Sequence, residues 1–299
     1  MASTRKQKIF RDRTLYIMFL PCFTYFFIFH YIPMWGARLA FQEFNFFGAN
    51  TWVGLNNFRI LLSSPVFRRI FLNTVVISFL KLLFNFPMPI VLALLLLELR
   101  KSCSRKMVQS VVYLPHFLSW VVIAGIFISM LSTSGGLVNE FLGFFRIGPI
   151  SFMTSHSYIR WVLVFSEMWR SIGWDSILYV AAIMAIPLEL YDAASIEGCS
   201  RAQEITHITL PLIFPTMVTV FILNLGFFMN AGFDQVFNLM NDSVISKIDI
   251  IDTYVYRVGL IQGEFSLGTA AGLFKGVIGL VLIYGTHRGS KKLTGVGLW

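Results

Sequence analysis

The residues from Leu15 to Trp35 form a run of 21 that contains no Asp, Glu, Lys or Arg. A helix needs about 20 such residues to cross the hydrocarbon layer of a membrane, which is about 30 Å thick. Five basic residues precede the run, so a cleaved signal peptide is the alternative. Signal cores are only about 7–15 residues long and end at a small-x-small cleavage site, which this run lacks. The run therefore predicts a membrane-spanning helix.

Five more apolar segments follow, in a chain that is 56% apolar and only 13% charged. The segments are Ile70 to Leu97, Met107 to Leu131, Tyr158 to Ile186, Leu212 to Met240, and Phe265 to Tyr284. Together with the first run they predict an all-α integral membrane protein with about six transmembrane helices.

Six spans place both termini on the same side of the membrane. With the termini inside, the inner segments hold thirteen Lys or Arg residues and the outer segments hold seven. This asymmetry follows the positive-inside rule and accounts for much of the net charge of +9, so no nucleic-acid partner is expected. We predict a cytoplasmic tail at residues 1–14, one lipid-embedded domain at 15–287 and a second cytoplasmic tail at 288–299.

The sequence offers no recognisable catalytic or metal site. The three cysteines, Cys22, Cys103 and Cys199, lack C-x-x-C spacing, and the five histidines form no H-E-x-x-H pattern. Paired-carboxylate and nucleophile-elbow motifs are also missing from the spans. We therefore expect no metal, no bound cofactor and no covalent chemistry on this chain.

A polar stretch, YDAASIEGCSRAQEITHITLP (Tyr191 to Pro211), separates the fourth and fifth apolar segments. It holds three acids and one Arg on the side of the membrane where basic residues are expected. Helix formers after Pro187 predict one helix that ends at Gly198, then a second from Ser200 to Thr209, with Pro211 opening the fifth span. Interfacial helices are usually rich in Lys and Arg, so the acidity favours a protein partner over lipid headgroups.

The same stretch resembles the E-A-A-x-x-D-G-A…I-x-L-P signature of importer-type ABC transporter permeases. Six residues match as written: Ala193, Ala194, Gly198, Ile208, Leu210 and Pro211. Asp192 stands where the signature has Glu, Glu197 stands where it has Asp, and Cys199 replaces the usual Ala. The segments VGLNNFRILL, YLPHFLSWVV, SGGLVNEFLG, IIDTYVYRVGL and GTAAGLFKGVI resemble the oligosaccharide and polysaccharide subgroup of carbohydrate permeases, which includes alginate-type permeases.

The resemblance implies a type I importer permease with a cytoplasmic coupling helix in the segment 187–211, between the fourth and fifth spans. In that family the helix docks into a groove of a separate ATPase subunit. The residues expected to mediate this coupling are Asp192, Ala193, Ala194, Glu197, Gly198, Ile205, Ile208, Leu210 and Pro211.

The resemblance also implies an assembly in the bacterial plasma (inner) membrane. Its other members are a second permease subunit in a heterodimer, two ATP-binding cassette ATPase subunits and an extracytoplasmic solute-binding protein. The chain itself has no G-x-x-x-x-G-K-[ST] loop, so ATP and Mg are expected on the partner ATPases.

Ionisable residues within the spans are costly unless they face a cavity or a partner group. The candidate pathway residues carry a charge, an amide or an indole: Glu167, Arg170, Trp174, Asn230, Asp234 and Lys275. The first three share a face of the fourth span, and Asn230 and Asp234 would share a face of the fifth. In the alternative interpretation Glu167 and Arg170 simply neutralise each other, and Lys81 or Lys275 pairs with an acid on a neighbouring helix or subunit.

We therefore predict a permease subunit that forms the path for an oligosaccharide or polysaccharide in an ATP-driven importer. Arg170 and Lys275 raise the option of an acidic cargo such as alginate, because a buried carboxylate needs cationic partners. A secondary-active sugar or organic-anion transporter is the alternative, but such proteins are often built from internal repeats and none is found here.

Overall fold

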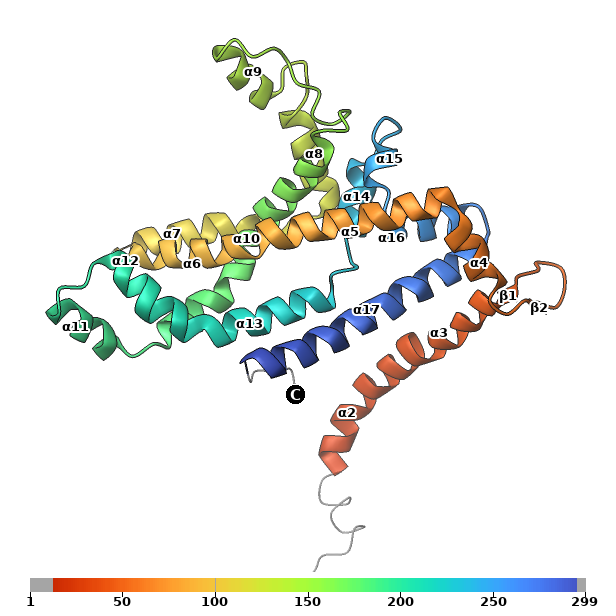
Figure 1. The fold of residues 1–299 in the computed structure, drawn as a ribbon, viewed down its shortest axis with the longest axis horizontal. Coiled ribbons are helices and arrows are strands. Elements are labelled where there is room, and N and C mark those ends of the chain that lie inside the picture. The colour runs from red at the N-terminus through yellow and green to blue at the C-terminus, as the bar shows by residue number, and fades with distance from the viewer. Residues whose placement is uncertain (1–12, 100, 295–299) are drawn as a thin grey trace, which may run out of the picture. The chain divides into compact units, whose positions relative to one another are not determined.

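The structure, a computed structural model, describes residues 13–99 and 101–294, which are almost entirely helical (Figure 1). The predicted tails extend beyond this part, since residues 1–12 and 295–299 lie outside the described residues. The chain divides into two compact units, and each is described by itself.

The first unit contains residues up to Ser63 together with Val255–Phe274. Its elements are α2 (Arg13–Phe26), η1 (Phe27–Tyr31), α3 (Ile32–Met34), η2 (Trp35–Phe41), β1 (Gln42–Glu43), β2 (Thr51–Trp52), α4 (Asn56–Ser63), η5 (Val255–Ile261) and the start of α17 (Phe265–Thr294). The two short strands pair antiparallel. A Cβ atom on Gly268 would lie only 2.7 Å from the Cα atom of Gly259, so glycine allows η5 and α17 to approach closely here.

The second unit contains Ser64–Tyr254 and the remainder of α17. Its elements are α5 (Pro65–Asn85), α6 (Pro87–Glu98), α7 (Ser102–Tyr113), η3 (Leu114–Phe117), α8 (Trp120–Met130), α9 (Leu137–Phe144), α10 (Ile159–Met184), α11 (Leu188–Ile196), α12 (Arg201–Glu204), η4 (Ile205–Thr209), α13 (Leu210–Gly226), α14 (Phe233–Leu239), α15 (Ile245–Ile248) and α16 (Ile251–Tyr254).

Helix α10 organises the second unit, because its buried side chains belong to two apolar clusters. Toward its N-terminus, Leu163 packs in a cluster with Ile77 of α5 and Val236 of α14. Toward its C-terminus, Tyr179 packs in a cluster with Ala93 of α6 and Ile213 of α13. The helix that carries Glu167, Arg170 and Asp175 is therefore held by neighbours toward both of its ends.

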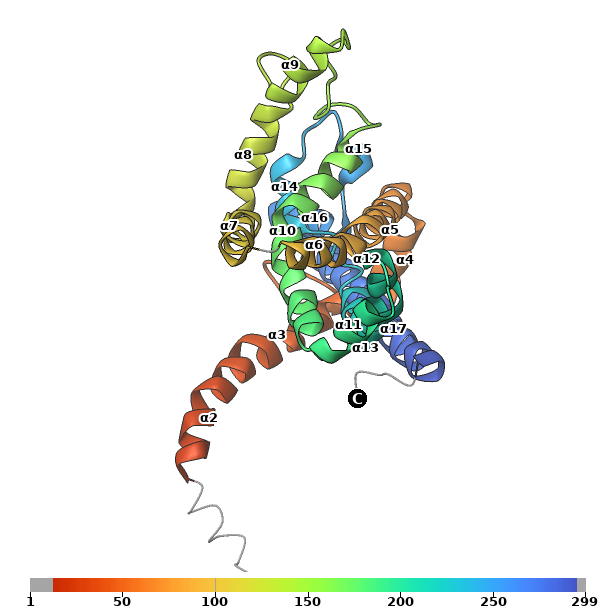
Figure 2. The ribbon, with the colours of Figure 1, turned by 90° about the vertical axis from the view of Figure 1, so that its left-hand side faces the viewer.

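Four helical segments of the described chain are long and apolar enough to cross a membrane, and six if each of two bent pairs counts as one span. The third span bends by 105° between Cys103–Phe117 and Trp120–Met130, where the chain passes Pro115. Figure 2 shows α8 leaving α7 at this bend. Proline removes a backbone donor, and α7 passes into the short 3-10 turn η3 at Pro115. The bend itself lies at Leu118 and Ser119, where the backbone is extended.

The fifth span differs from the prediction at both ends. It begins at Arg201 rather than at Pro211 and ends at Gly226 rather than at Met240. The wider π-helical turn η4 precedes Pro211, so the helix continues across a residue that cannot donate a hydrogen bond. Beyond Gly226 the chain stays non-helical until Gly232, whose φ of 93° suits a residue without a side chain.

Candidate functional site

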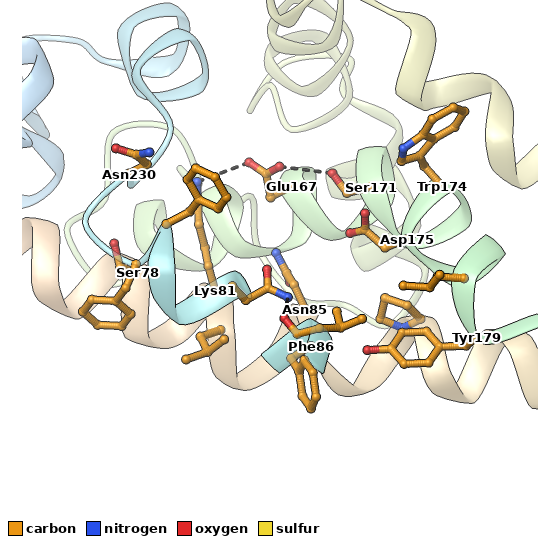
Figure 3. A pocket seen from close by; sticks show the side chains of 17 residues that line it. Ser78, Lys81, Asn85, Phe86, Glu167, Ser171, Trp174, Asp175, Tyr179 and Asn230 are labelled. Atoms are coloured by element: carbon orange, nitrogen blue, oxygen red, sulfur yellow. Dashed lines mark hydrogen bonds and ion pairs between the residues drawn. The ribbon is translucent and has the colours of Figure 1, made fainter. Parts of the chain in front are cut away.

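A cavity of about 410 Å³ lies in the second unit between α5, α10, α13 and the segment that follows α13 (Figure 3). Its polar and indole-bearing lining residues are Ser78, Lys81, Asn85, Glu167, Ser171, Trp174, Asp175, Tyr179, Asn224 and Asn230. Hydroxyl, amide and carboxylate groups at a concave surface can bind a hydroxyl-rich solute through hydrogen bonds.

Three of the six predicted pathway residues line this cavity: Glu167, Trp174 and Asn230. On the polar face of α5 the sequence interpretation counted Lys81 among the charges within the spans but missed Ser78 and Asn85. Ser78, Lys81 and Asn85 are spaced i, i+3 and i+7, which places them on one side of that helix. This spacing is visible in the sequence, but two of its members are neutral and lie in an otherwise apolar segment.

Lys81 is the charged centre of the cavity wall. Its ammonium lies 3.3 Å from Glu167 Oε2 and donates to the carbonyl of Ala231 at 2.7 Å and to Gln235 Oε1. Ser171 Oγ donates to the other oxygen of Glu167 at 3.1 Å, and Figure 3 shows both partners of the carboxylate. The wall therefore contains a paired charge with additional hydrogen bonds, which lowers the cost of burying it.

Arg170 does not neutralise Glu167, contrary to the proposed ion pair. Its guanidinium lies over the ring of Trp120, 5.1 Å from the ring centroid, and its buried Nε has no hydrogen-bond partner. The reason is that Lys81 reaches Glu167 from α5, whereas Arg170 is directed toward α8. Arg170 is not among the residues that line the cavity.

Trp174 lines the cavity but already has aromatic neighbours. The His116 ring stacks on it with centroids 4.5 Å apart and planes within 4°, and Phe117 meets its edge at 5.7 Å. These neighbours come from η3, at the bend of the third span. A close approach at Gly173 allows this contact, because a Cβ atom there would lie 2.0 Å from the carbonyl oxygen of Val112.

Asn230 and Asp234 do not share a helix face, which corrects the sequence interpretation. Asn230 lies in the non-helical segment after α13, and Asp234 lies in the first turn of α14, exposed and away from the cavity lining. Lys275 also lies outside the cavity lining and pairs with Asp252 at 2.6 Å. For Lys275 the structure therefore matches the alternative of pairing with an acid on a neighbouring helix.

The predicted coupling residues lie in α11, in the turn that follows it and in the helix that begins at Arg201. Asp192, Ala193, Glu197 and Gly198 are exposed, while Ala194 is buried. Gly198 follows α11 with φ of 80°, where the chain turns back. This arrangement presents an acidic surface on a short helix.

A side-chain hydrogen bond joins α11 to the start of the fifth span. Tyr191 Oη and Thr209 Oγ1 lie 2.9 Å apart. The predicted separate helix from Ser200 to Thr209 is instead the first part of the fifth span. Ser200 caps it, with its hydroxyl accepting from the Gln203 N–H and the Gln203 side chain accepting from the Ser200 N–H. Ile205, Ile208 and Leu210 are half-buried on this helix, and Pro211 is exposed.

The whole chain is similar to known transport proteins. It is 40% identical over 295 residues to the polygalacturonan/rhamnogalacturonan transport system permease protein YteP of Bacillus subtilis. This match covers 98% of this chain and 92% of the relative. The chain belongs to the sugar ABC transporter permeases. The permease is also 39% identical to Protein LplB of Bacillus subtilis over 292 residues, covering 97% of this chain and 92% of that protein. No protein-family model matches the sequence.

Solved structures agree with the sequence relatives over the full length of the permease. A bacterial ABC transporter involved in the import of the acidic polysaccharide alginate contains a chain with a TM-score of 0.91 and 39% identity, covering 98% of this chain and 100% of that chain. A bacterial alginate ABC transporter in complex with alginate pentasaccharide-bound periplasmic protein gives a TM-score of 0.92 at 38% identity, covering 99% and 100%.

This membership confirms the predicted family and the all-α, multi-pass fold class. It also confirms the role of a carbohydrate importer permease and removes the secondary-active alternative.

Proposed function

We propose that the permease forms, with a second permease subunit, the membrane path of an ATP-driven importer for an extended saccharide. The observation that carries this proposal is the full-length similarity to a chain of the alginate importer, at a TM-score of 0.92. ATP is hydrolysed, and Mg bound, by two partner ATPases, which agrees with the lack of a phosphate-binding loop in this sequence. This chain contributes shape and binding groups rather than catalysis.

A solute-binding protein outside the membrane delivers the cargo, as the bound periplasmic protein of the alginate transporter suggests. The second permease is a different chain in this proposal. The complex lies in the bacterial plasma membrane with both termini in the cytoplasm, which the distribution of Lys and Arg supports.

Helix α11 is the coupling helix of this proposal. Its exposed acids Asp192 and Glu197, with Ala193 and Gly198 between and beside them, form the surface that meets the ATPase. Ala194, Ile205, Ile208, Leu210 and Pro211 hold the segment in place or pass its movement to the fifth span. The hydrogen bond between Tyr191 and Thr209 supports this division, because it fixes α11 to that span.

The cargo path of this chain is the cavity lined by Glu167, Trp174, Asp175 and Asn230. An acidic saccharide is the favoured cargo because one relative is a polygalacturonan/rhamnogalacturonan transport system permease and a structural neighbour belongs to a transporter that imports the acidic polysaccharide alginate. Arg170 makes no ion pair within the described part of the chain, so its charge is open to a carboxylate after rearrangement.

The test is substrate-stimulated ATPase activity in the reconstituted complex with its binding protein. Uronic-acid oligomers are compared with neutral oligomers of equal length, in the wild type and in Arg170→Gln. We expect stronger stimulation by uronic-acid oligomers and a selective loss of that preference in the variant. Stimulation by neutral oligomers alone would discard the acidic cargo, and no stimulation by any saccharide would contradict the proposed function.

A further inference from the structure

The chain is not helical between the end of α13 at Gly226 and the start of α14 at Phe233, and this segment, residues 227–232, is called the break below. Residues Phe227–Gly232 are not helical, and three of them, Phe227, Phe228 and Asn230, line the cavity. Irregular backbone at membrane depth is tolerated only where protein or a polar cavity satisfies its N–H and C=O groups. The shape of this wall therefore depends on the partners of the broken segment.

We propose that Lys81 is a positioning residue that fixes this break against the second and fourth spans. Lys81 lies near the middle of the span Pro65–Glu98. Its ammonium donates to the Ala231 carbonyl at 2.7 Å, inside the break, and to Gln235 Oε1, just after it. Glu167 Oε2 on α10 lies 3.3 Å away. One side chain thus connects α5, α10 and α14.

The surroundings of Lys81 fit this role. A Cβ atom on Gly232 would lie 2.9 Å from Lys81 Nζ, so the ammonium rests directly against the backbone of the break. The Gln235 amide continues the connection, since its Nε2 donates to the Leu163 carbonyl at 2.6 Å and to Ser166 Oγ at 2.8 Å. Gln235 and Ser166 are fully buried, so these bonds face little competition from water.

The same geometry indicates that Lys81 does not bind the charge of an acidic cargo. An ammonium group has three donors. Ala231, Gln235 and Glu167 supply three acceptors, so no donor remains for a carboxylate of the cargo. Lys81 therefore shapes the cavity wall along which an acidic saccharide passes, and Lys81 does not itself bind the carboxylate of that saccharide. This part of the inference rests on the proposed function, whereas the fixing of the break does not.

The first test reports on the break itself, in the full complex and in a background without Cys22, Cys103 and Cys199. A reporter cysteine replaces Ala231, which is 1% exposed, and its reaction with a water-soluble thiol reagent is timed. We expect Lys81→Met to accelerate labelling roughly tenfold or more, the effect expected when hydrogen bonds to a charged group are lost. A reporter at Ala124, equally buried on α8, should keep its wild-type rate.

A double variant separates positioning from simple charge balance. In Lys81→Met with Glu167→Gln the carboxylate that Lys81 had paired is removed as well, yet the Ala231 carbonyl still lacks its donor. Fast labelling at position 231 should therefore persist. Wild-type labelling in Lys81→Met, or a return to the wild-type rate in the double variant, would overturn the proposal.

The second test measures the concentration of oligomer that gives half-maximal ATPase stimulation. Lys81→Met should raise this concentration by a similar factor, about tenfold, for uronic-acid and neutral oligomers, because the shared wall is disturbed. Lys106→Met removes an exposed lysine and should behave as the wild type. A loss confined to uronic-acid oligomers would show that Lys81 binds the cargo carboxylate and would overturn the positioning role. If neither oligomer stimulates the wild-type complex, the proposed cargo path fails, while the labelling rates still decide the role of Lys81.

Discussion

Gly198 shows how one residue sets the geometry of the acidic segment. Its φ of 80° lies in the left-handed region, and a Cβ atom there would meet no atom within 4 Å. A substitution is therefore resisted by the backbone conformation and not by a clash. Non-glycine residues pay roughly 1–2 kcal/mol in this region, and β-branched residues are the least suited to it.

We expect Gly198→Val to insert into the membrane normally and to assemble poorly with the ATPase, or to lose much of the stimulation by substrate. Gly198→Asn is the matched control, because Asn tolerates positive φ and should retain most of the activity. Co-purification of the ATPase with the permease, followed by ATPase assays, measures both variants. Equal behaviour of Val and Asn at this position would contradict the expectation.

Single residues also show what the sequence could not predict. The charge at Glu167 was visible, but its partner Lys81 lies 86 positions away, and only the packing of α5 on α10 joins them. The nearer candidate, Arg170, has the correct helical spacing yet finds the ring of Trp120 instead. Local spacing limits which residues can meet, whereas tertiary packing decides which of them do.

At the scale of elements, α11 and the start of the fifth span form one mechanical unit through the Tyr191–Thr209 hydrogen bond. We expect Tyr191→Phe to leave membrane insertion and ATPase binding intact while reducing substrate-stimulated ATPase activity several-fold. The reason is that a net hydrogen bond contributes about 1 kcal/mol, which corresponds to roughly a fivefold change.

A double-mutant cycle with Thr209→Val provides the control for this prediction. If the two hydroxyls act on each other, the double variant should lose no more activity than either single variant. Additive losses would show that the two side chains act independently.

Apolar length predicted the helices well, and it could not predict where they break. The second and sixth spans appear where apolar runs occur, although each contains one lysine, because a membrane span is specified by composition over many residues. The end of α13 at Gly226 and the positive φ of Gly232 lie inside the apolar run predicted from Leu212 to Met240. A distant residue, Lys81, donates to the Ala231 carbonyl in this segment in place of a helical N–H group.

At the scale of the whole molecule, the prediction concerns orientation in the membrane. Exposed positions Lys106 and Arg201 should be cytoplasmic and exposed position Asn56 should lie outside. Single cysteines at these sites, in a background without the three native cysteines, can be labelled from either side with a membrane-impermeant reagent. Labelling of position 201 from the outside would overturn the orientation.

Helix α13 (Leu210–Gly226) has a consequence for how far a small movement travels. Its 17 residues, at about 1.5 Å each, make a rod of about 25 Å, with Thr209, the partner of Tyr191, just before one end and the cavity residue Asn224 near the other. Such a rod is a lever: a tilt of about 10° about one end displaces the other by about 4 Å. The non-helical segment after Gly226 then acts as a hinge, so α13 can move while the cavity wall beyond this segment stays in place.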